Sequence, residues 1–192
     1  MQAARFWAAC FEKEGNMYIW IGCRLPAEFE RTLRSRCLEL NRDIGLDTVA
    51  FSLPQHISLK ISFEAGAAAP DILDAVEALL RDEKPFYVNP YAIETAGNIL
   101  WLTFQENDTL RKLHHLLDRT LEHNFGIPQH PFDKDFLFHS TLFLGEPERL
   151  ARMQAGLSGF ALPPELVVDT FLLGLSETGE AGSFRVVRQI KV

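Results

Sequence analysis

The sequence predicts an α+β protein with two lobes, in which two antiparallel sheets related by a pseudo-twofold axis carry helices on their outer faces and enclose a central cleft. Two observations lead to this prediction. Short apolar runs with alternating polarity are interspersed with longer segments whose apolar residues recur every three or four positions, as in strands and amphipathic helices. The order strand, helix, hairpin also occurs twice, which indicates duplication in element order rather than in residue identity.

In the first half of the chain, turn residues and apolar periodicity delimit two helices between strands. Pro26 is placed to open a helix, because proline suits the first helical turn. Gly97 lies between two β-prone runs, which indicates a hairpin. The expected elements are a strand at 17–23, a helix after Pro26, a strand at 56–63, a helix at about 70–82 and a hairpin formed by 86–95 and 98–104.

The second half repeats this order. Asn107 or Asp108 is expected to cap a third helix, since both residues favour that position. Gly126 and Pro128 end this helix. The expected elements are a helix at about 108–124, a strand at 136–144, a short helix at about 146–157 and two closing strands at 165–175 and 183–191.

Length and composition are those of one globular domain. The chain has 192 residues, of which 47% are hydrophobic and 23% are charged. We expect residues 17–192 to form a single bilobal domain and residues 1–16 to be an N-terminal extension. No apolar run reaches the length of a transmembrane helix, and the start of the chain is too acidic for a secretion signal.

Charge and cysteine content narrow the partners and the compartment. The net charge of −7 disfavours a long nucleic-acid duplex, because affinity for its backbone comes from Lys and Arg. A small anion in a local pocket remains compatible with this charge. The three cysteines lack paired spacing, as is typical of reduced thiols in the cytosol. We expect a cytoplasmic monomer that does not associate with membranes.

Two short motifs carry the candidate chemistry. The run QHISLKISF contains His56 and Ser58, and the run FLFHSTLFLG contains His139 and Thr141. Because alternate side chains of a strand share a face, each histidine is expected to lie beside its hydroxyl residue. Two such strands placed side by side would present two imidazoles and two hydroxyls to one groove. This set suits acid–base chemistry on a phosphate ester.

Other side chains are candidate substrate contacts. By strict alternation, Lys60 shares the face of His56, and Phe143 shares the face of His139. Lys60 either adds a cation at the phosphate or is a solvated strand residue. Phe143 either stacks on a base or packs in the core. Further pocket candidates are Tyr18, Trp20, Trp101, Phe132 and Arg185.

Metal sites and serine nucleophiles are not indicated. His114 and His115 are adjacent on a predicted helix, and adjacent helical residues do not face each other. No HExxH motif or nearby carboxylate triad completes a site around them. A general esterase using Ser58 or Ser140 is disfavoured, since the sequence has no GxSxG elbow. We expect neither a metal nor a cofactor.

The two motifs resemble those of the 2H phosphoesterase superfamily, which is named after two His-x-Ser/Thr motifs, one in each lobe. This superfamily includes 2′-5′ RNA ligase-like proteins and cyclic nucleotide phosphodiesterases. The resemblance covers about residues 17–192. It implies that His56 and His139 are the catalytic pair and that Ser58 and Thr141 bind phosphate. Ser58 departs mildly from the threonine that is common in the first motif, but it keeps the hydroxyl.

The resemblance implies a metal-independent phosphodiesterase that hydrolyses a 2′,3′-cyclic phosphate or a 2′-5′-linked nucleotide or RNA end. One imidazole would deprotonate water and the other would protonate the ribose oxygen. Two alternatives stay open at this point. One is 2′-5′ RNA ligation, because joining a 5′-hydroxyl to a cyclic phosphate reverses transesterification. The other is a non-catalytic nucleotide- or RNA-binding module that retains the cleft.

Overall fold

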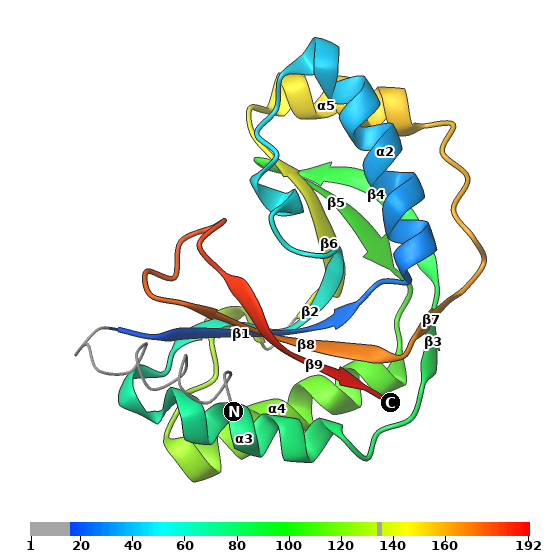
Figure 1. The fold of residues 1–192 in the computed structure, drawn as a ribbon. Helices are drawn as coiled ribbons and strands as arrows, with labels where there is room; N and C mark the ends of the chain where they lie inside the picture. The colour runs from blue at the N-terminus through cyan, green and yellow to red at the C-terminus, as the bar shows by residue number, and fades with distance from the viewer. Residues whose placement is uncertain (1–15, 134–135) are drawn as a thin grey trace, which may run out of the picture.

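The computed structural model describes residues 16–133 and 136–192 and shows an α+β fold with two lobes (Figure 1). The predicted class is confirmed. The predicted extension at residues 1–16 lies, apart from its last residue, outside the described ranges. Within those ranges no helix is long and apolar enough to cross a membrane.

The element bounds follow the expected order. The strands are β1 (Tyr18–Arg24), β2 (His56–Glu64), β3 (Phe86–Val88), β4 (Pro90–Ala96), β5 (Ile99–Phe104), β6 (His139–Leu144), β7 (Leu166–Val168), β8 (Thr170–Ser176) and β9 (Arg185–Lys191). The helices are α2 (Ala27–Ile44), α3 (Ala69–Leu80), α4 (Asp108–Phe125) and α5 (Pro147–Leu157), with short 3-10 turns η1 (Val49–Phe51), η2 (Gly66–Ala68) and η3 (Pro131–Asp133).

Each lobe is built on one antiparallel sheet with two helices. The first lobe has strand order β2-β1-β8-β9 and carries α3 and α4, whereas the second has order β4-β5-β6 and carries α2 and α5 (Figure 1). Helix α2 follows β1 of the first lobe but packs against α5 of the second, and α4 follows β5 of the second lobe but packs against β2 of the first. Because each lobe takes a helix that follows a strand of the other, no single cut of the chain separates them.

Two strands that were expected to be continuous are each divided. The strand predicted at 86–95 is β3 and β4, with Asn89 between them, and the strand predicted at 165–175 is β7 and β8, with Asp169 between them. Pro90 begins β4, a position where its missing N–H is tolerated. The detached pieces β3 and β7 pair with each other as an antiparallel ribbon beside the two lobes (Figure 1).

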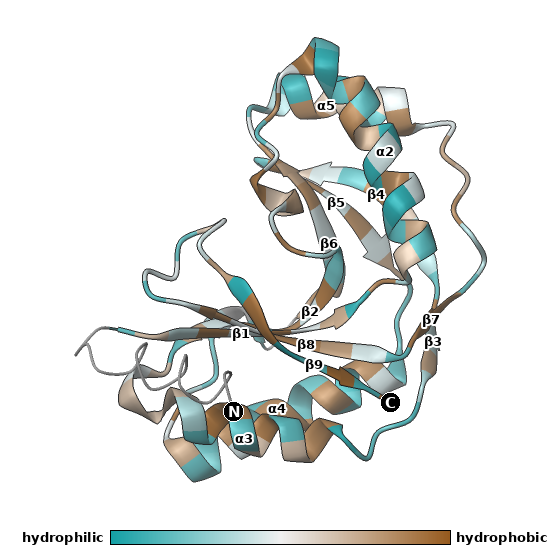
Figure 2. Ribbon diagram, viewed as in Figure 1, coloured by the Kyte–Doolittle hydropathy of each residue, from teal (hydrophilic) through white to brown (hydrophobic). Residues whose placement is uncertain are grey.

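The predicted apolar faces of the helices are buried. In α4 the leucines of the predicted stripe are fully buried: Leu110, Leu113, Leu117 and Leu121. The side chain of Asn107 accepts a hydrogen bond from the N–H of Leu110 at 3.0 Å, and Gly126 ends the helix with φ 67°, a conformation that glycine adopts freely. In Figure 2 hydrophobic residues follow the strands, and hydrophilic residues follow parts of the helices.

An irregularity in β2 changes which residues face each side of the sheet. Ser58 and Lys60 are opposite adjacent residues of β1, so Leu59 is an extra residue. Such a bulge interrupts the alternation of the strand, and Leu59 and Lys60 are both buried. The prediction that Lys60 shares the face of His56 is therefore wrong, because strict alternation stops at Leu59.

The second motif strand has an irregularity at the same distance from its histidine. Thr141 and Phe143 are opposite adjacent residues of β5, so Leu142 is extra. Phe143 is fully buried and packs against Phe51, with ring centroids 5.2 Å apart and ring planes at 81°. The prediction that Phe143 shares the face of His139 is therefore wrong, and of the two alternatives for this side chain the structure shows packing in the core.

Lys60 neutralises a buried acidic pair on the helical side of the first sheet. Its side chain is 2% exposed, and its ammonium lies 2.7 Å from Oδ1 of Asp118 in α4. The same ammonium also pairs with Asp133 in η3. Lys60 is therefore not available as a substrate contact, and it links β2 to α4 and η3.

The substitution Lys60→Met is expected to lower the free energy of unfolding by about 3–5 kcal/mol, because it leaves two buried carboxylates without their cation. Urea denaturation followed by circular dichroism measures this change. Lys112→Met is the control, because Lys112 is 66% exposed and its nearest carboxylate is 3.7 Å away, so it should change stability by less than about 1 kcal/mol. Equal losses in the two variants would contradict a structural role for the buried pair.

Candidate active site

A cleft of about 670 Å³ lies between the lobes and receives both motifs. Its lining includes His56 and Ser58 from β2 and His139 and Thr141 from β6. The structure thus places all four candidate residues at one cleft, although they come from distant parts of the chain. The volume is in the range of small-molecule binding sites.

The two imidazoles are held by the same local contact. Nδ1 of His56 lies 2.7 Å from the carbonyl oxygen of Pro54, and Nδ1 of His139 lies 2.8 Å from the carbonyl oxygen of Leu137. A carbonyl can only accept, so each Nδ1 carries a hydrogen and donates it. Nε2 is then the atom of each ring that remains for proton exchange with a ligand. In both contacts the carbonyl belongs to the residue two positions before the histidine. The residue types in the motifs do not predict these hydrogen bonds.

Burial shifts both histidines toward the neutral form. Burial lowers the pKa of the His56 imidazole to about 4, while the hydrogen bond to Pro54 opposes this change and the charge of His139 adds to it. Burial also lowers the pKa of His139, and the hydrogen bond to Leu137 opposes that change. Both rings are therefore neutral in the free cleft at neutral pH, and the pKa of His56 also responds to the charge of His139.

Trp20 supports the first motif. Its ring meets the His56 ring at a centroid distance of 4.1 Å and an angle of 61°, and its Nε1 donates to Oγ of Ser58 at 3.1 Å. Two glycines make room for the indole, since an added Cβ would lie 2.6 Å from Trp20 at Gly22 and 2.7 Å from it at Gly174. The absence of a side chain at Gly22 on the same strand and at Gly174 on the neighbouring β8 is what allows the indole to lie there.

Trp101 occupies the corresponding place at the second motif. Its ring meets the His139 ring at 4.5 Å and 47°, and it lies opposite Thr141 in the sheet. Unlike the Nε1 of Trp20, that of Trp101 is buried without a hydrogen-bond partner among the described residues. A buried donor of this kind is costly unless something else accepts from it.

Only some of the other aromatic and cationic residues predicted to line the pocket do so. Trp20 and Trp101 line the cleft, whereas Tyr18 and Arg185 are not among its lining residues. The side chain of Phe132 lies outside the described part of the chain. The remaining walls are largely apolar, with Ile61, Ile99, Leu144 and Phe184 among them.

A buried hydrogen bond joins the two motif strands directly. Oγ of Ser140 donates to Oε1 of Gln55 at 2.9 Å, and both side chains are buried. Gln55 precedes His56, and Ser140 follows His139. The hydroxyl of Ser140 is therefore engaged inside the protein, which argues against the esterase alternative that would use it as a nucleophile.

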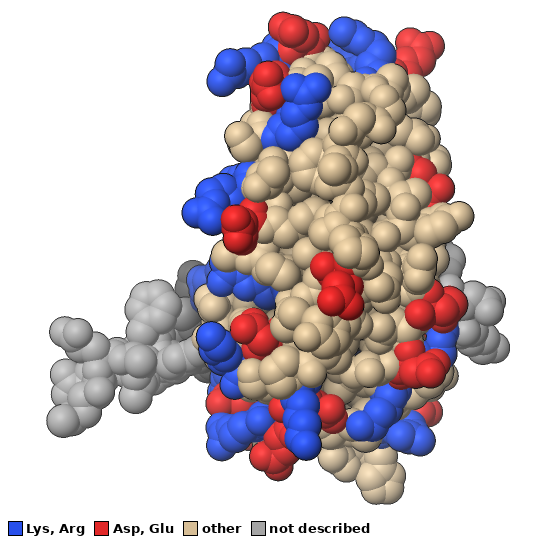
Figure 3. Space-filling view, turned by 90° about the vertical axis from the view of Figure 1, so that its right-hand side faces the viewer, with Lys and Arg blue, Asp and Glu red and all other residues tan. Residues whose placement is uncertain are grey.

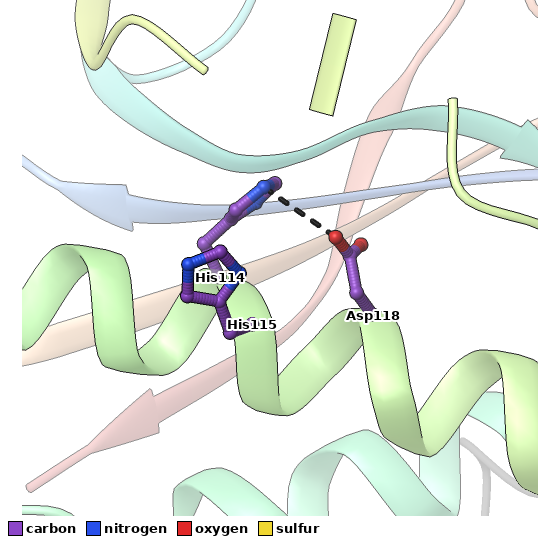
Figure 4. A group of neighbouring side chains, drawn as sticks. All are labelled: His114, His115 and Asp118. Carbon is purple, nitrogen blue, oxygen red and sulfur yellow. Dashed lines mark ion pairs between the residues drawn. The ribbon is translucent and has the colours of Figure 1, made fainter. Parts of the chain in front are cut away.

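The pair His114 and His115 gains a carboxylate neighbour, Asp118, within 4.8 Å (Figure 4). Both ring nitrogens of His114 are already engaged. Nδ1 lies 2.7 Å from the carbonyl oxygen of Leu59, and Nε2 lies 3.2 Å from that of Asp133 and 3.4 Å from a carboxylate oxygen of Asp118. His114 and Asp118 belong to the buried ionic cluster around the Lys60 ammonium, whereas His115 is exposed, so the three side chains do not fit a metal ion.

The comparison with protein families agrees with the motifs. A model described as the 2′-5′ RNA ligase superfamily matches residues 32–180, which include both motifs. The chain belongs to this superfamily, and the resemblance to 2H phosphoesterases is confirmed. No curated protein matches the chain.

Solved structures share the fold over nearly their whole length. TT0787 of Thermus thermophilus has a TM-score of 0.60 at 21% identity, covering 91% of this chain and 97% of that one. LigT of E. coli, solved with 3′-AMP, has a TM-score of 0.57 at 14% identity, covering 93% and 98%. Usb1 of Kluyveromyces marxianus has a TM-score of 0.53 at 10% identity, covering 94% and 99%. At these identities the likeness shows the fold alone.

The substitution Gly174→Ala is expected to reduce phosphoesterase turnover by about 10- to 100-fold, because the new methyl group displaces Trp20 and with it His56 and Ser58. The loss of stability should stay near 1–3 kcal/mol, as is usual for a small overpacking. Steady-state kinetics and thermal unfolding measure the two effects. Gly159→Ala is the matched control, since nothing lies within 4 Å of its added Cβ. Unchanged turnover in Gly174→Ala would contradict a positioning role for Trp20.

Proposed function

We propose that this protein is a metal-independent phosphodiesterase that hydrolyses a 2′,3′-cyclic phosphate or a 2′-5′-linked nucleotide or RNA end. The observation that carries the proposal is the paired placement of His56 and His139 at one cleft, each with Nδ1 fixed by a backbone carbonyl. Two imidazoles on opposite lobes are suited to in-line displacement, which needs a base on one side of phosphorus and an acid on the other.

The reaction divides between the two rings. Nε2 of one imidazole takes a proton from water as its oxygen attacks phosphorus. Nε2 of the other gives a proton to the ribose oxygen as the P–O bond to it breaks. The near-equivalence of His56 and His139 leaves either ring able to take either role.

The hydroxyls beside the histidines are proposed to stabilise the charge that grows on the non-bridging oxygens. Oγ of Ser58 accepts from Trp20, so its own hydrogen remains available for the phosphate. Thr141 offers a hydroxyl at the equivalent position of the other strand. These donors are neutral, so they stabilise developing charge without a metal ion.

Substrate binding is proposed to set the protonation state that the reaction needs. In the free cleft, burial keeps both imidazoles neutral at neutral pH. An anionic phosphate placed between them favours a proton on one ring and raises the pKa of that ring. The bound complex then holds one acid and one base.

Ligation uses the same groups in the reverse direction, with a 5′-hydroxyl in place of water. The superfamily carries the name of this reaction. Hydrolysis is the stronger proposal because water is always present at high concentration. We also propose that the protein acts in the cytoplasm as a monomer. Its described cysteines, Cys23 and Cys37, are free thiols, and all four motif residues come from one chain.

The proposal is tested with purified protein in EDTA and two substrates, adenosine 2′,3′-cyclic phosphate and 2′-5′ oligoadenylate. His56→Ala and His139→Ala are each expected to lower kcat by about 10²–10⁴-fold, since each removes one proton transfer. His123→Ala is the control, because His123 is exposed on α4 and lies outside the cleft. Binding by the wild-type protein without turnover of either substrate would support the binding module instead. Turnover abolished by EDTA would contradict the metal-independent reaction.

A further inference from the structure

The cleft contains no cationic side chain among its described lining residues. Its polar side-chain groups are the two motif histidines, the two motif hydroxyls, the hydroxyls of Ser52 and Ser62 and the indole N–H groups of Trp20 and Trp101. This is unusual for a site that handles phosphate esters, because bound phosphates in proteins commonly meet Arg or Lys. Charge recognition in this cleft therefore depends on neutral donors and on one proton shared by two imidazoles.

A neutral donor remains unused in the free protein. The indole Nε1 of Trp101 is buried and has no partner among the described residues, although the ring borders the cleft beside His139. The equivalent donor of Trp20 is already used by Ser58. Because the Nε1 atom is itself buried, a phosphate oxygen at the second motif would reach this donor only after the Trp101 ring shifts toward the cleft.

The walls disfavour a second charge. Ile61, Ile99, Leu144 and Phe184 present apolar surface around the motif residues. Moving an ionised phosphate from water against such surface is costly unless it gains a cation or several hydrogen bonds. The four motif side chains can satisfy one phosphate, and the described lining offers no comparable set for another.

The net charge of the whole chain also disfavours a ligand with several negative charges. The chain carries a net charge of −7, which repels polyanions. On the face drawn in Figure 3, basic side chains are interspersed with acidic ones and surround a broad region without charged residues. That face is the side of the molecule that carries β3 and β7, so the charge argument for the cleft rests on the cleft's own lining residues.

We propose that the cleft is specific for a nucleoside cyclic phosphate that carries a single negative charge, and that it rejects the same nucleoside with a further 5′-phosphate. This specificity rests on the proposed function and narrows it to small substrates without flanking phosphates. The sugar and base of such a ligand pack against the apolar walls. The oxygens of its one phosphate accept hydrogen bonds from the protonated imidazole and from the neutral donors.

The first test compares two substrates that differ by one phosphate: adenosine 2′,3′-cyclic phosphate and the same compound with a 5′-phosphate. The added phosphate is expected to lower kcat/KM by at least about tenfold, mainly through KM, because uncompensated desolvation weakens binding. Equal or higher kcat/KM for the 5′-phosphorylated substrate would overturn the proposal.

A binding measurement separates this inference from the proposed function. Calorimetry at pH 5, where a phosphate monoester with a second pKa near 6 carries about one negative charge, compares adenosine 2′-monophosphate with adenosine 2′,5′-bisphosphate, and neither needs to be turned over. The expected result is a Kd at least about tenfold weaker for the bisphosphate. If neither cyclic substrate is hydrolysed but this ratio holds, the proposed function fails and the charge preference stands. A ratio near one, or no binding of either ligand, overturns the charge preference.

The third test adds the missing cation. Ser62→Lys places an ammonium at the cleft on an exposed position of β2. It is expected to narrow the difference in kcat/KM between the two cyclic substrates by at least about threefold, through attraction to the extra phosphate. Ser35→Lys adds the same charge at an exposed position of α2 outside the cleft, so it should leave the ratio unchanged. Equal effects of the two variants would overturn the role of the cleft in this preference.

Discussion

The contact between Gln55 and Ser140 is the constraint on which the site depends. It is a buried hydrogen bond of 2.9 Å between the residue before His56 and the residue after His139. The strands β2 and β6 belong to different sheets, so no ladder of backbone hydrogen bonds sets their relative position. This side-chain bond does so at the point where the two histidines enter the cleft. Helices α2 and α4 each follow a strand of one lobe and pack in the other, so the chain also ties the two lobes together.

The two halves of the site hold their histidines by the same kinds of contact. In each, the carbonyl two residues before the histidine holds Nδ1, a tryptophan covers the ring, and a bulge after the hydroxyl residue turns the following side chains inward. The halves differ in one respect that matters for chemistry. Trp20 is bonded to its hydroxyl residue, whereas Trp101 retains a donor that no described residue accepts from. The ligand therefore meets a cleft that is symmetric in its proton carriers and asymmetric in its hydrogen-bond donors.

Sequence patterns were sufficient for the parts of the fold that depend on local physics. Period-two alternation located both motif strands, and the leucine stripe with Asn107 and Gly126 delimited α4 closely. Alternation failed at Lys60 and Phe143, because a bulge depends on pairing with the neighbouring strand and leaves no local pattern. The exchange of helices between lobes and the room that Gly174 makes for Trp20 are tertiary, and the carbonyl contacts of the histidines, although local, depend on a backbone path that residue types do not specify. Pairing of His56 with His139 was reached only by combining two weak motifs with the duplicated element order.

The central claim is that both imidazoles serve one phosphorus centre. Nuclear magnetic resonance of the ring Cε1–Hε1 groups, with inorganic phosphate added across a range of pH, tests this most directly. The free protein should show both rings titrating below pH 6.5, with His56 near 4. On addition of phosphate, both resonances should move with a single dissociation constant, and the pKa of one ring should rise because an anion favours the imidazolium. Movement of only one ring, or two independent constants, would contradict a shared site.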